Sequence, residues 1–298
     1  MIPLSSRYIR LLLIGIAIVI LGLAYAYFVE PGRLVIRNET IHISGWNPAF
    51  DGLRIAVIGD IHGGSNGADA DKLRRVVTET NALTPDLIVL LGDYVSQKDD
   101  ARTSRDLRMP MNEVAGNLSG MKALYGVFAV LGNHDGWYGD REVREQLEAV
   151  GIKVLENDAV TIDKNGQKLR VLGLPDHMKA QNWAWFSAEA RAAVDRAGND
   201  GDIVVLEHSP DILPMITGEL SISPKLKLIL AAHTHGGQVW LPILGSPIVP
   251  SSYGQKYAYG HVRDRGVDLF VTSGIGTSIL PFRFLVPPEI VILTVRSE

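Results

Sequence analysis

The sequence contains no cysteine. Disulfides, thiolate metal sites and thiol nucleophiles are therefore excluded. Any metal site has to use His, Asp, Glu or Asn, and such ligands suit Mn, Fe, Zn or Mg. An excess of positive charge is also absent, because 29 Lys and Arg residues face 33 Asp and Glu residues and the formal net charge is −4. We therefore expect no surface that coats nucleic acid and no nucleic-acid partner.

The chain also lacks internal repeats, low-complexity segments and any linker after residue 33. Its 298 residues are enough for one large α/β domain. Within residues 30–52, Leu34–Arg37 and Thr40–Ile43 alternate in polarity as edge strands do. We therefore expect short strands over 30–52, followed by one domain over 53–298.

The N-terminal segment contains an uncharged run of 19 residues, Leu11–Val29. A helix of this length spans roughly 28 Å, which is close to the thickness of a bilayer's hydrocarbon core. Because Arg7 and Arg10 precede the run, we expect a single pass over residues 9–29 with the N-terminus in the cytoplasm. The alternative is a cleaved signal peptide with Ala24-Tyr25-Ala26 as its cleavage site. The length of the run favours the anchor, and both interpretations export the rest of the chain.

Three apolar runs in the first half of the chain each end in glycine followed by an acidic or amide residue. Leu53–Ile58 leads to Gly59-Asp60, Leu87–Leu91 to Gly92-Asp93, and Val127–Leu131 to Gly132-Asn133. Helical patterns at Asp69–Ala82 and Met111–Leu124 separate them, and this alternation predicts βαβ units with a largely parallel sheet. Since parallel strands end at one edge of a sheet, we expect Asp60, Asp93 and Asn133 to converge.

The second half of the chain places histidines after its strand-like runs. Ile203–Leu206 is followed by His208, and Leu226–Ala231 by His233-Thr234-His235. Seven oxygen or nitrogen donors thus follow strand ends: Asp60, His62, Asp93, Asn133, His208, His233 and His235. Seven donors are too many ligands for one ion, whereas two ions that share a carboxylate would keep open positions for water and substrate.

Other motifs carry less chemistry. His42, His177 and His261 are interpreted as core or surface histidines, and the charged stretch 96–106 predicts a loop. Trp183, Trp185 and Phe186 predict an apolar loop, as does 241–250. Such loops either cover a pocket or touch lipid, or else they pack in the core.

The motifs taken together resemble the calcineurin-like metallophosphoesterase superfamily over about residues 53–295. They are Asp60-x-His62, Gly92-Asp93, Gly132-Asn133-His134-Asp135, His208 and His233-x-His235. The stretches 59–62 and 233–238, with the tails 281–284 and 287–290, are similar to a bacterial subgroup of membrane-anchored or exported phosphodiesterases. Some members of that subgroup hydrolyse the pyrophosphate of UDP-2,3-diacylglucosamine. Ala232 departs from the pattern, which usually has glycine before His-x-His.

The resemblance implies a metallophosphoesterase-type β-sandwich flanked by helices, in four layers α/β/β/α, with two divalent metal ions. It implies that Asp60, His62 and His235 hold one ion and that Asn133, His208 and His233 hold the other. Asp93 would bridge the two. A hydroxide shared by the ions would attack phosphorus. His134 would protonate the leaving oxygen, and Asp135 would orient the ring of His134.

The expected function is hydrolysis of a phosphomonoester, phosphodiester or pyrophosphate bond, with a substrate that is membrane-associated or lipid-linked. The expected location is the inner, cytoplasmic membrane, with the catalytic domain on the extracytoplasmic side. A lipid A precursor fits that side poorly, because such lipids are made on the cytoplasmic face. The alternatives are a nuclease or cyclic-nucleotide phosphodiesterase, and a non-catalytic scaffold that keeps the fold.

Overall fold

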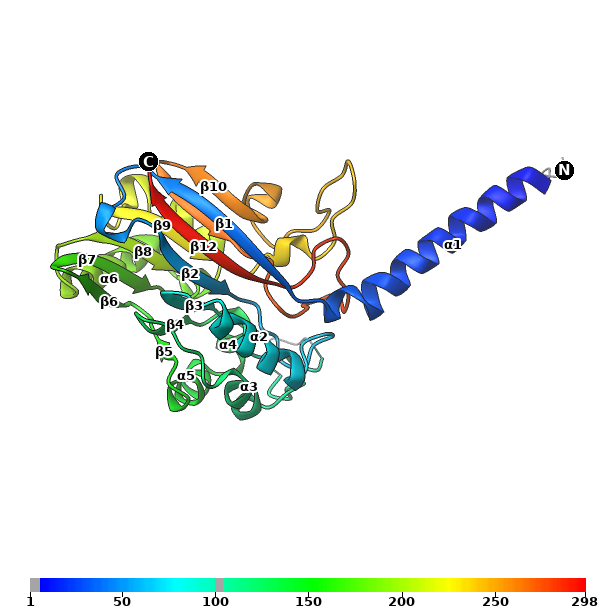
Figure 1. The fold of residues 1–298 in the computed structure, drawn as a ribbon, viewed down its shortest axis with the longest axis horizontal. Helices are drawn as coiled ribbons and strands as arrows, with labels where there is room; N and C mark the ends of the chain where they lie inside the picture. The colour runs from blue at the N-terminus through cyan, green and yellow to red at the C-terminus, as the bar shows by residue number, and fades with distance from the viewer. Residues whose placement is uncertain (1–5, 100–103) are drawn as a thin grey trace.

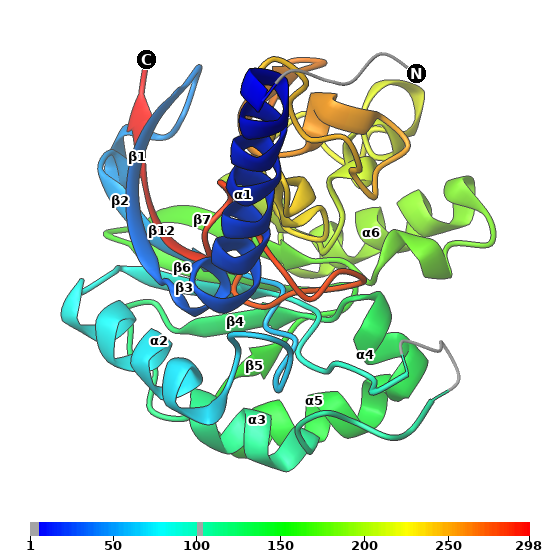
Figure 2. The same cartoon turned by 90° about the vertical axis from the view of Figure 1, so that its right-hand side faces the viewer.

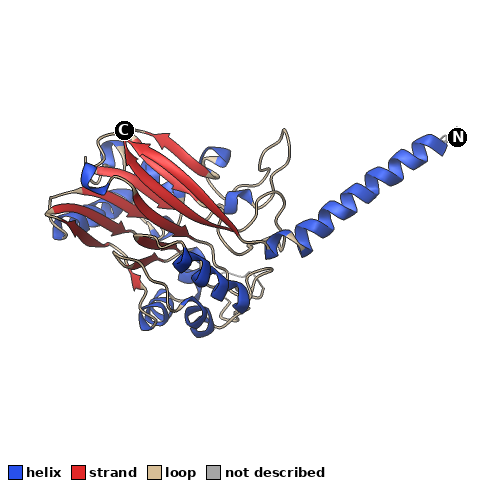
Figure 3. Cartoon of the chain, viewed as in Figure 1, coloured by secondary structure: helices blue, strands red, loops and turns tan. Residues whose placement is uncertain are grey.

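The computed structural model describes residues 6–99 and 104–298. Within them, two six-stranded β-sheets pack face to face, and helices cover their outer faces (Figure 1). Figure 3 shows the strands gathered between helices on either side, with one helix projecting from the body. The fold is therefore the α/β sandwich with an N-terminal apolar helix that the sequence predicted.

The strands are β1 (Val35–Ile43), β2 (Leu53–Ile58), β3 (Leu87–Leu91), β4 (Val127–Val130), β5 (Lys153–Val154), β6 (Asp158–Lys164), β7 (Gln167–Gly173), β8 (Asp202–Leu206), β9 (Leu226–Ala231), β10 (Gly260–Asp264), β11 (Val267–Val271) and β12 (Glu289–Ser297). The α-helices are α1 (Ser6–Phe28), α2 (Ala70–Ala82), α3 (Met111–Leu118), α4 (Asn133–Tyr138), α5 (Asp140–Ala149) and α6 (Trp183–Arg196).

Parallel pairing sets the direction of the strands that matter for function. The first sheet has the order β1-β12-β2-β3-β4-β5, and β2, β3 and β4 are parallel neighbours. The second has the order β10-β11-β9-β8-β7-β6, and β7, β8 and β9 are parallel. The carboxyl ends of parallel strands share an edge, so each sheet presents one edge at which several polar turns meet.

The central strands β2, β3 and β4 of the first sheet are almost entirely buried on both faces. In β3, Leu87, Val89 and Leu91 pack in the core between the two sheets, whereas Ile88 and Leu90 pack beneath the helices. This alternation follows from the two-residue repeat of a strand. It explains why β3 appears in the sequence as an unbroken apolar run.

Two helices differ from their predicted bounds. The helix expected over Met111–Leu124 ends at Leu118, where Ser119 is extended and Gly120 takes φ +84°. The predicted loop at Trp183–Phe186 is wrong, because these residues form the first turn of α6. Asn182 caps that turn by accepting a hydrogen bond from Trp185 N at 3.1 Å, and a capped N-terminus of this kind stabilises a helix.

The charged stretch 96–106 contains no helix in its described part, as expected for a loop. Gln97 and Leu107 form an isolated antiparallel bridge across it. Residues 100–103 of the predicted loop lie outside the described residues.

The segment between the anchor and the domain is part of the first sheet. The two short strands expected within 30–52 form one strand, β1, which pairs in parallel with β12 over its full length. Trp46 and Phe50, which follow β1, are buried in the core between the sheets. This segment is therefore packed against the domain.

Helix α1 projects from the body, and its side chains are largely exposed (Figure 1). The segment Ser6–Gly32 is long and apolar enough to cross a membrane. A helix that is apolar on every side and unburied is typical of a membrane span. The structure thus contains a helix suited to act as the membrane anchor.

Candidate metal centre

Seven polar side chains predicted to be metal ligands lie together at the carboxyl ends of the strands of both sheets. Asp60 and His62 follow β2, Asp93 follows β3, and Asn133 begins α4 after β4. From the second sheet, His208 follows β8, and His233 and His235 follow β9. All are buried except His233, which is half-buried.

Asp93 lies at the middle of this set. Its Oδ2 atom is 3.4 Å from His62 Nε2 and 3.3 Å from His208 Nε2. His208 Nε2 is in turn 3.1 Å from His233 Nδ1. Ligands of one small divalent cation are separated by roughly 3–3.5 Å, since each lies about 2.1 Å from the ion. The carboxylate of Asp93 therefore reaches both sides of the site, as a shared ligand must.

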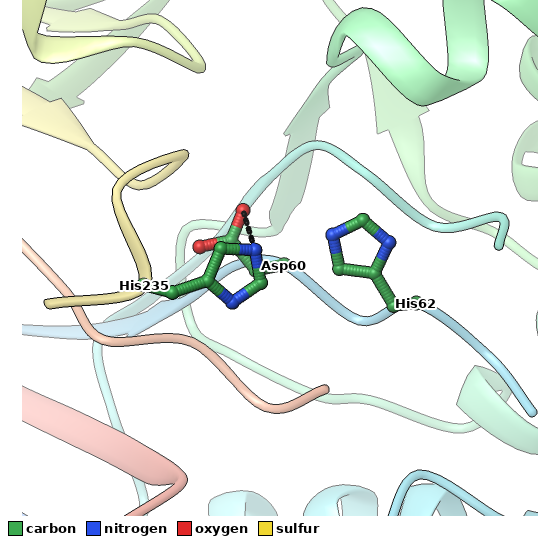
Figure 4. Close-up of side chains that lie close together, drawn as sticks. All are labelled: Asp60, His62 and His235. Carbon is green, nitrogen blue, oxygen red and sulfur yellow. Dashed lines mark ion pairs between the residues drawn. The ribbon is translucent and has the colours of Figure 1, made fainter. Parts of the chain in front are cut away.

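The second group of donors lies on the other side of Asp93. Asp60 Oδ1 is 3.9 Å from His235 Nε2, and the rings of His62 and His235 stack with centroids 5.0 Å apart. Figure 4 shows these three side chains, brought together from the segment after β2 and from the turn after β9. Their donor atoms all lie within 4.8 Å of one another.

Several of these buried donors have no hydrogen-bond partner among the described residues: Asp60 Oδ2, His62 Nε2 and Asn133 Oδ1. An unpartnered polar group in a protein interior costs about 1–3 kcal/mol. Three such atoms that face a common space fit cations, which would satisfy all of them. The donors contain no sulfur, in agreement with hard or borderline divalent ions.

Hydrogen bonds that the rings donate to backbone carbonyls set the orientation of two of the imidazoles. His208 Nδ1 lies 2.7 Å from the carbonyl of Leu91, and His62 Nδ1 lies 3.2 Å from the carbonyl of Val95. A carbonyl accepts only from a protonated nitrogen, so Nδ1–H is the bonded form. Each Nε2 is then left to face the site as a donor to a metal.

Burial also controls the charges of the ligands. It lowers the pKa of His62 to about 3 and that of His233 to about 4, so both rings are neutral at pH 7. Burial raises the pKa of Asp60 to about 7. Burial opposes the charge of Asp93 too, but His208 and His134 hold the pKa of Asp93 well below its usual range. Burial opposes the charge of His208, but Asp93 and Asp60 raise its pKa well above the usual range. His208 therefore has to release a proton when it binds a metal, whereas His62, His233 and Asp93 already have the forms that bind metal.

The backbone of the site is strained. Five of the seven side chains lie on residues with positive φ: Asp60 (48°), His62 (41°), Asp93 (56°), His233 (69°) and His235 (52°). A residue other than glycine in this region costs of order 1–3 kcal/mol, and such residues cluster at functional sites. The turn lets His233 and His235, two residues apart, face the same space.

Glycines make room for the ligands. A Cβ on Gly132 would overlap the carboxylate of Asp93, so this position requires glycine. A Cβ on Gly59 would lie 2.6 Å from the methyl group of Ala232. Ala232, which departs from the family pattern, is thus packed against Gly59 and leaves the following His233 within the donor set.

His134 faces the same pocket, and its ring contacts Gln97 and Ser278. Its Nδ1 lies 2.7 Å from Gln97 Oε1, and its Nε2 lies 3.4 Å from Ser278 Oγ. Its backbone N–H donates to Asp93 Oδ1 at 2.9 Å. Gln97 is fully buried and also donates from Nε2 to the His134 carbonyl at 3.1 Å. The sequence did not identify Gln97 as a site residue, because Gln97 lies in a charged loop and no neighbouring motif indicates a role for it.

Asp135 accepts its described hydrogen bonds from backbone groups, whereas Gln97 contacts the ring of His134 at Nδ1, so the orientation of that ring by Asp135 stays a prediction. Its carboxylate accepts hydrogen bonds from the backbone N–H groups of Asp93 (2.8 Å), Tyr94 (2.8 Å) and Gly132 (2.9 Å), and from Val95 at 3.2 Å. It therefore fixes the turn after β3, on which Asp93 stands. Burial and the charge of Asp93 raise the pKa of Asp135 to about 7.

A neighbouring cluster was also missed. His177 Nδ1 lies 3.4 Å from Asp176 Oδ1 and 3.8 Å from Glu207 Oε1. Burial opposes its charge, but these two carboxyl groups raise the pKa of His177 to about 10. Its ring contacts that of His233 edge-on at 6.4 Å and stacks on Trp183 at 6.3 Å. His177, interpreted as structural from the sequence, thus holds a positive charge beside the donor set.

A cavity of about 450 Å³ opens onto the donor set. Its polar lining includes Asp93, Asn133, His134, His233 and His235. Its outer lining is mostly apolar and comes from three loops and α4: Trp137, Met178, Ile248, Pro250, Ile279 and Leu280. The cavity therefore combines a polar floor with an apolar mouth.

Comparison with known proteins agrees with this geometry. A family model described as calcineurin-like phosphoesterase matches residues 53–237. The chain is 30% identical to "Uncharacterized metallophosphoesterase YkuE" of Bacillus subtilis (strain 168), over 93% of this chain and 90% of that protein. It is 26% identical to "Phosphodiesterase YaeI" of Escherichia coli (strain K12), over 91% and 92% respectively. It is also 26% identical to "Transmembrane protein with metallophosphoesterase domain" of Danio rerio, over 96% of this chain but 62% of that protein.

Proposed function

The chain belongs to the calcineurin-like phosphoesterase family, and we propose that it hydrolyses the phosphoester or pyrophosphate bond of a lipid-linked substrate at two divalent cations. The observation that carries the proposal is the group of buried donors around Asp93, several of which have no hydrogen-bond partner among residues 6–99 and 104–298. We assign Asp60, His62 and His235 to one cation. Asn133, His208 and His233 are assigned to the other, with Asp93 shared.

Cations bound there would lower the pKa of a shared water and neutralise phosphate oxygens as charge develops. The protein's part is to hold the donors before substrate arrives. The strained turns and the backbone bonds of Asp135 keep Asp93 in place, which avoids reorganisation during the reaction. Asn133 adds a neutral ligand, so its cation keeps more of its positive charge.

His134 is proposed to donate a proton to the leaving oxygen from Nε2. Its Nδ1 is held by Gln97, which directs Nε2 toward the pocket and Ser278. Ser278 lines the cavity with His134, so a leaving group bound there would lie beside both side chains. Gln97 acts through His134 and is a positioning residue.

The substrate class is inferred from the mouth of the cavity and from α1. The apolar lining residues fit a hydrocarbon or aromatic leaving group, and the cavity-lining residues described here contain no Lys or Arg for a nucleic-acid backbone. We assign residues 9–29 to the anchor and 53–298 to the catalytic domain. We infer a cytoplasmic N-terminus and an extracytoplasmic catalytic domain from Arg7 and Arg10.

The test uses the full chain in detergent with bis(p-nitrophenyl) phosphate as substrate. Treatment with a chelator is expected to abolish hydrolysis, and Mn, Fe, Zn or Mg returned singly would identify the ions that restore it. Hydrolysis that survives complete metal removal would overturn the proposal, as would the absence of hydrolysis with every metal and with phosphomonoester and pyrophosphate substrates.

A further inference from the structure

Two apolar loops at the mouth of the cavity lie beside the end of α1. The first spans residues 239–255 and the second spans 273–288 (Figure 1). Figure 2 shows the second loop at the base of α1 and the first loop above it, both on the side of the body from which the helix departs. We refer to them together as the rim loops.

The rim loops carry almost no charge. Residues 239–255 contain no Asp, Glu, Lys or Arg, and residues 273–288 contain one such residue, Arg283. Arg283 is fully buried, where its guanidinium donates to the carbonyls of Ser273, Gly276 and Val286. Every exposed side chain of both loops is therefore uncharged.

The exposed side chains of the rim loops include six large apolar ones: Trp240, Ile243, Leu244, Ile248, Ile279 and Leu285. Ile243 is fully exposed and has φ +75°, and Ile279 has φ +62°. A β-branched residue at positive φ is strained. Both loop tips thus hold β-branched apolar side chains out toward solvent in an unfavourable conformation, although folding alone gains nothing from their exposure.

The rim loops are joined to α1 by direct contacts. The backbone N–H of Arg283 donates to the carbonyl of Ala26 at 3.0 Å, and Phe284 packs edge-on against Tyr25 with ring centroids 6.4 Å apart. Leu285 N donates to Glu30 Oε2 at 2.7 Å. The second rim loop is thereby fixed to the last turns of the helix.

The first rim loop is fixed to the second. Trp240 N donates to the carbonyl of Phe284 at 2.9 Å, and Phe284 N donates to the carbonyl of Gln238 at 2.8 Å. The exposed apolar surface is consequently continuous with α1. When α1 crosses a bilayer, the rim loops are held at the surface of the same bilayer.

We propose that the rim loops form a membrane-docking surface that enters the interface of the bilayer spanned by α1, so that the cavity opens directly onto the lipid. Uncharged loops with Trp, Ile and Leu at their tips are suited to this depth, roughly 5–10 Å into the headgroup region. Ile248 and Ile279 belong to both the docking surface and the cavity lining. A lipid-linked phosphoester would pass from the interface to the donor set without leaving the surface. The inference about the substrate, though not about docking, rests on the proposed function.

The absence of cysteine allows a direct test of docking. The variants Ile279→Cys and Leu124→Cys are matched, because both side chains are 74% exposed. Leu124 precedes β4 at the opposite edge of the first sheet. Each full-chain variant is labelled with an environment-sensitive fluorophore and placed in phosphatidylcholine–phosphatidylglycerol nanodiscs. We expect brominated acyl chains to quench the label at 279 and not the label at 124. Equal quenching, or none at 279, would overturn docking.

A kinetic test addresses the delivery of substrate. Ile243 and Leu244 are exposed in the first rim loop and do not line the cavity. The double variant Ile243→Asp/Leu244→Asp is expected to lower turnover of a p-nitrophenyl phosphodiester of diacylglycerol in nanodiscs by about tenfold, because two apolar side chains no longer enter the interface. Hydrolysis of water-soluble bis(p-nitrophenyl) phosphate should not change, and Leu124→Asp should affect neither substrate.

The outcomes separate the two proposals. An equal loss on both substrates, or no loss on the lipid substrate, would overturn the role of the rim loops in presenting the cavity. If the wild-type chain hydrolyses no phosphodiester, phosphomonoester or pyrophosphate substrate with any of the four metals, the proposed function fails, while the quenching result still decides whether the loops dock.

Discussion

The two edges of the sheets use the same backbone conformation in different surroundings. At the amino ends of strands, Thr84 and Arg265 have φ of 47° and 53° in exposed turns. At the carboxyl ends, Asp60, Asp93 and His235 have φ of 48°, 56° and 52°, yet all three are buried. Three donor atoms at these strand ends have no hydrogen-bond partner in the described part of the chain: Asp60 Oδ2, His62 Nε2 and Asn133 Oδ1. Positive φ at an exposed turn is ordinary turn geometry, because water satisfies the polar groups. Positive φ combined with buried unpartnered donors indicates a site whose cost is recovered by bound cations.

The substitution Asp93→Asn should impair the site at the carboxyl ends of the strands more than any other change proposed below. Asp93 contacts donors on both sides of the site, so a neutral amide removes the charge shared by both cations. We expect metal content to fall to one ion per chain or fewer and turnover to fall by at least about a thousandfold. Elemental analysis measures the first quantity, and exposed Asp51→Asn serves as the control. Full metal occupancy in Asp93→Asn would show that the carboxylate is not shared.

The carboxyl edge could be predicted from local signals. Each of β2, β3 and β4 is a short apolar run followed by glycine and a polar residue, and parallel pairing brings the ends together. The partners of those residues could not be predicted. Gln97 and His134 are brought together by loops far apart in sequence, and the aromatic start of α6 depends on a cap from Asn182. The pattern of apolar residues predicts which strands are buried, but it does not predict which side chains come into contact across loops.

His134→Ala separates catalysis from metal binding within the buried edge. His134 contributes its backbone N–H to Asp93, and this contact remains in the alanine variant. We therefore expect unchanged metal content with turnover lower by about 10²–10⁴, the usual contribution of a general acid. A leaving group that needs no protonation, such as p-nitrophenolate, should reduce the loss. Equal rates for wild type and variant on every substrate would remove His134 from the mechanism.

Gln97→Leu tests a contact that the sequence did not predict, the one between Gln97 and the ring of His134. The leucine cannot accept from His134 Nδ1, which Gln97 Oε1 approaches to 2.7 Å. We expect kcat to fall roughly 10–100-fold with metal content retained, as is typical when a supporting hydrogen bond is lost. Gln97→Glu keeps the acceptor oxygen and should retain more activity than Gln97→Leu. The reverse order would contradict a role in holding the ring.

The charge of His177, at the carboxyl ends of the strands, should make the free energy of unfolding depend on pH. The unfolded chain releases this proton near pH 6.5, whereas Asp176 and Glu207 raise the pKa of folded His177 to about 10 despite burial. Its stabilising effect is therefore complete below pH 6.5 and is lost as the pH rises through 10. In chelator, the unfolding free energy of wild type relative to His177→Gln should fall by up to about 5 kcal/mol over this range, since one pKa unit corresponds to about 1.4 kcal/mol. Denaturant titrations in detergent at several pH values measure the difference. A difference that does not vary with pH would mean that His177 is neutral when folded.

The smallest effect is expected at the exposed edge, with Thr84→Gly. Thr84 is β-branched at φ 47°, and the contacts described for it come from its backbone, which accepts from Arg54 Nη1 at 3.1 Å and donates to Asn81 O at 3.1 Å. Glycine relieves the strain and keeps both contacts, but it also gives the unfolded chain more freedom. We expect a net stabilisation of about 0.5 kcal/mol in a denaturant titration.

Asn165→Gly, at φ 57°, should change stability less, because asparagine tolerates this conformation. If Thr84→Gly instead destabilises the chain by about 1 kcal/mol, as glycine does at an unstrained position, then positive φ carries no cost at the exposed edge. Positive φ at the carboxyl ends of the strands could then no longer be used as evidence for a functional site.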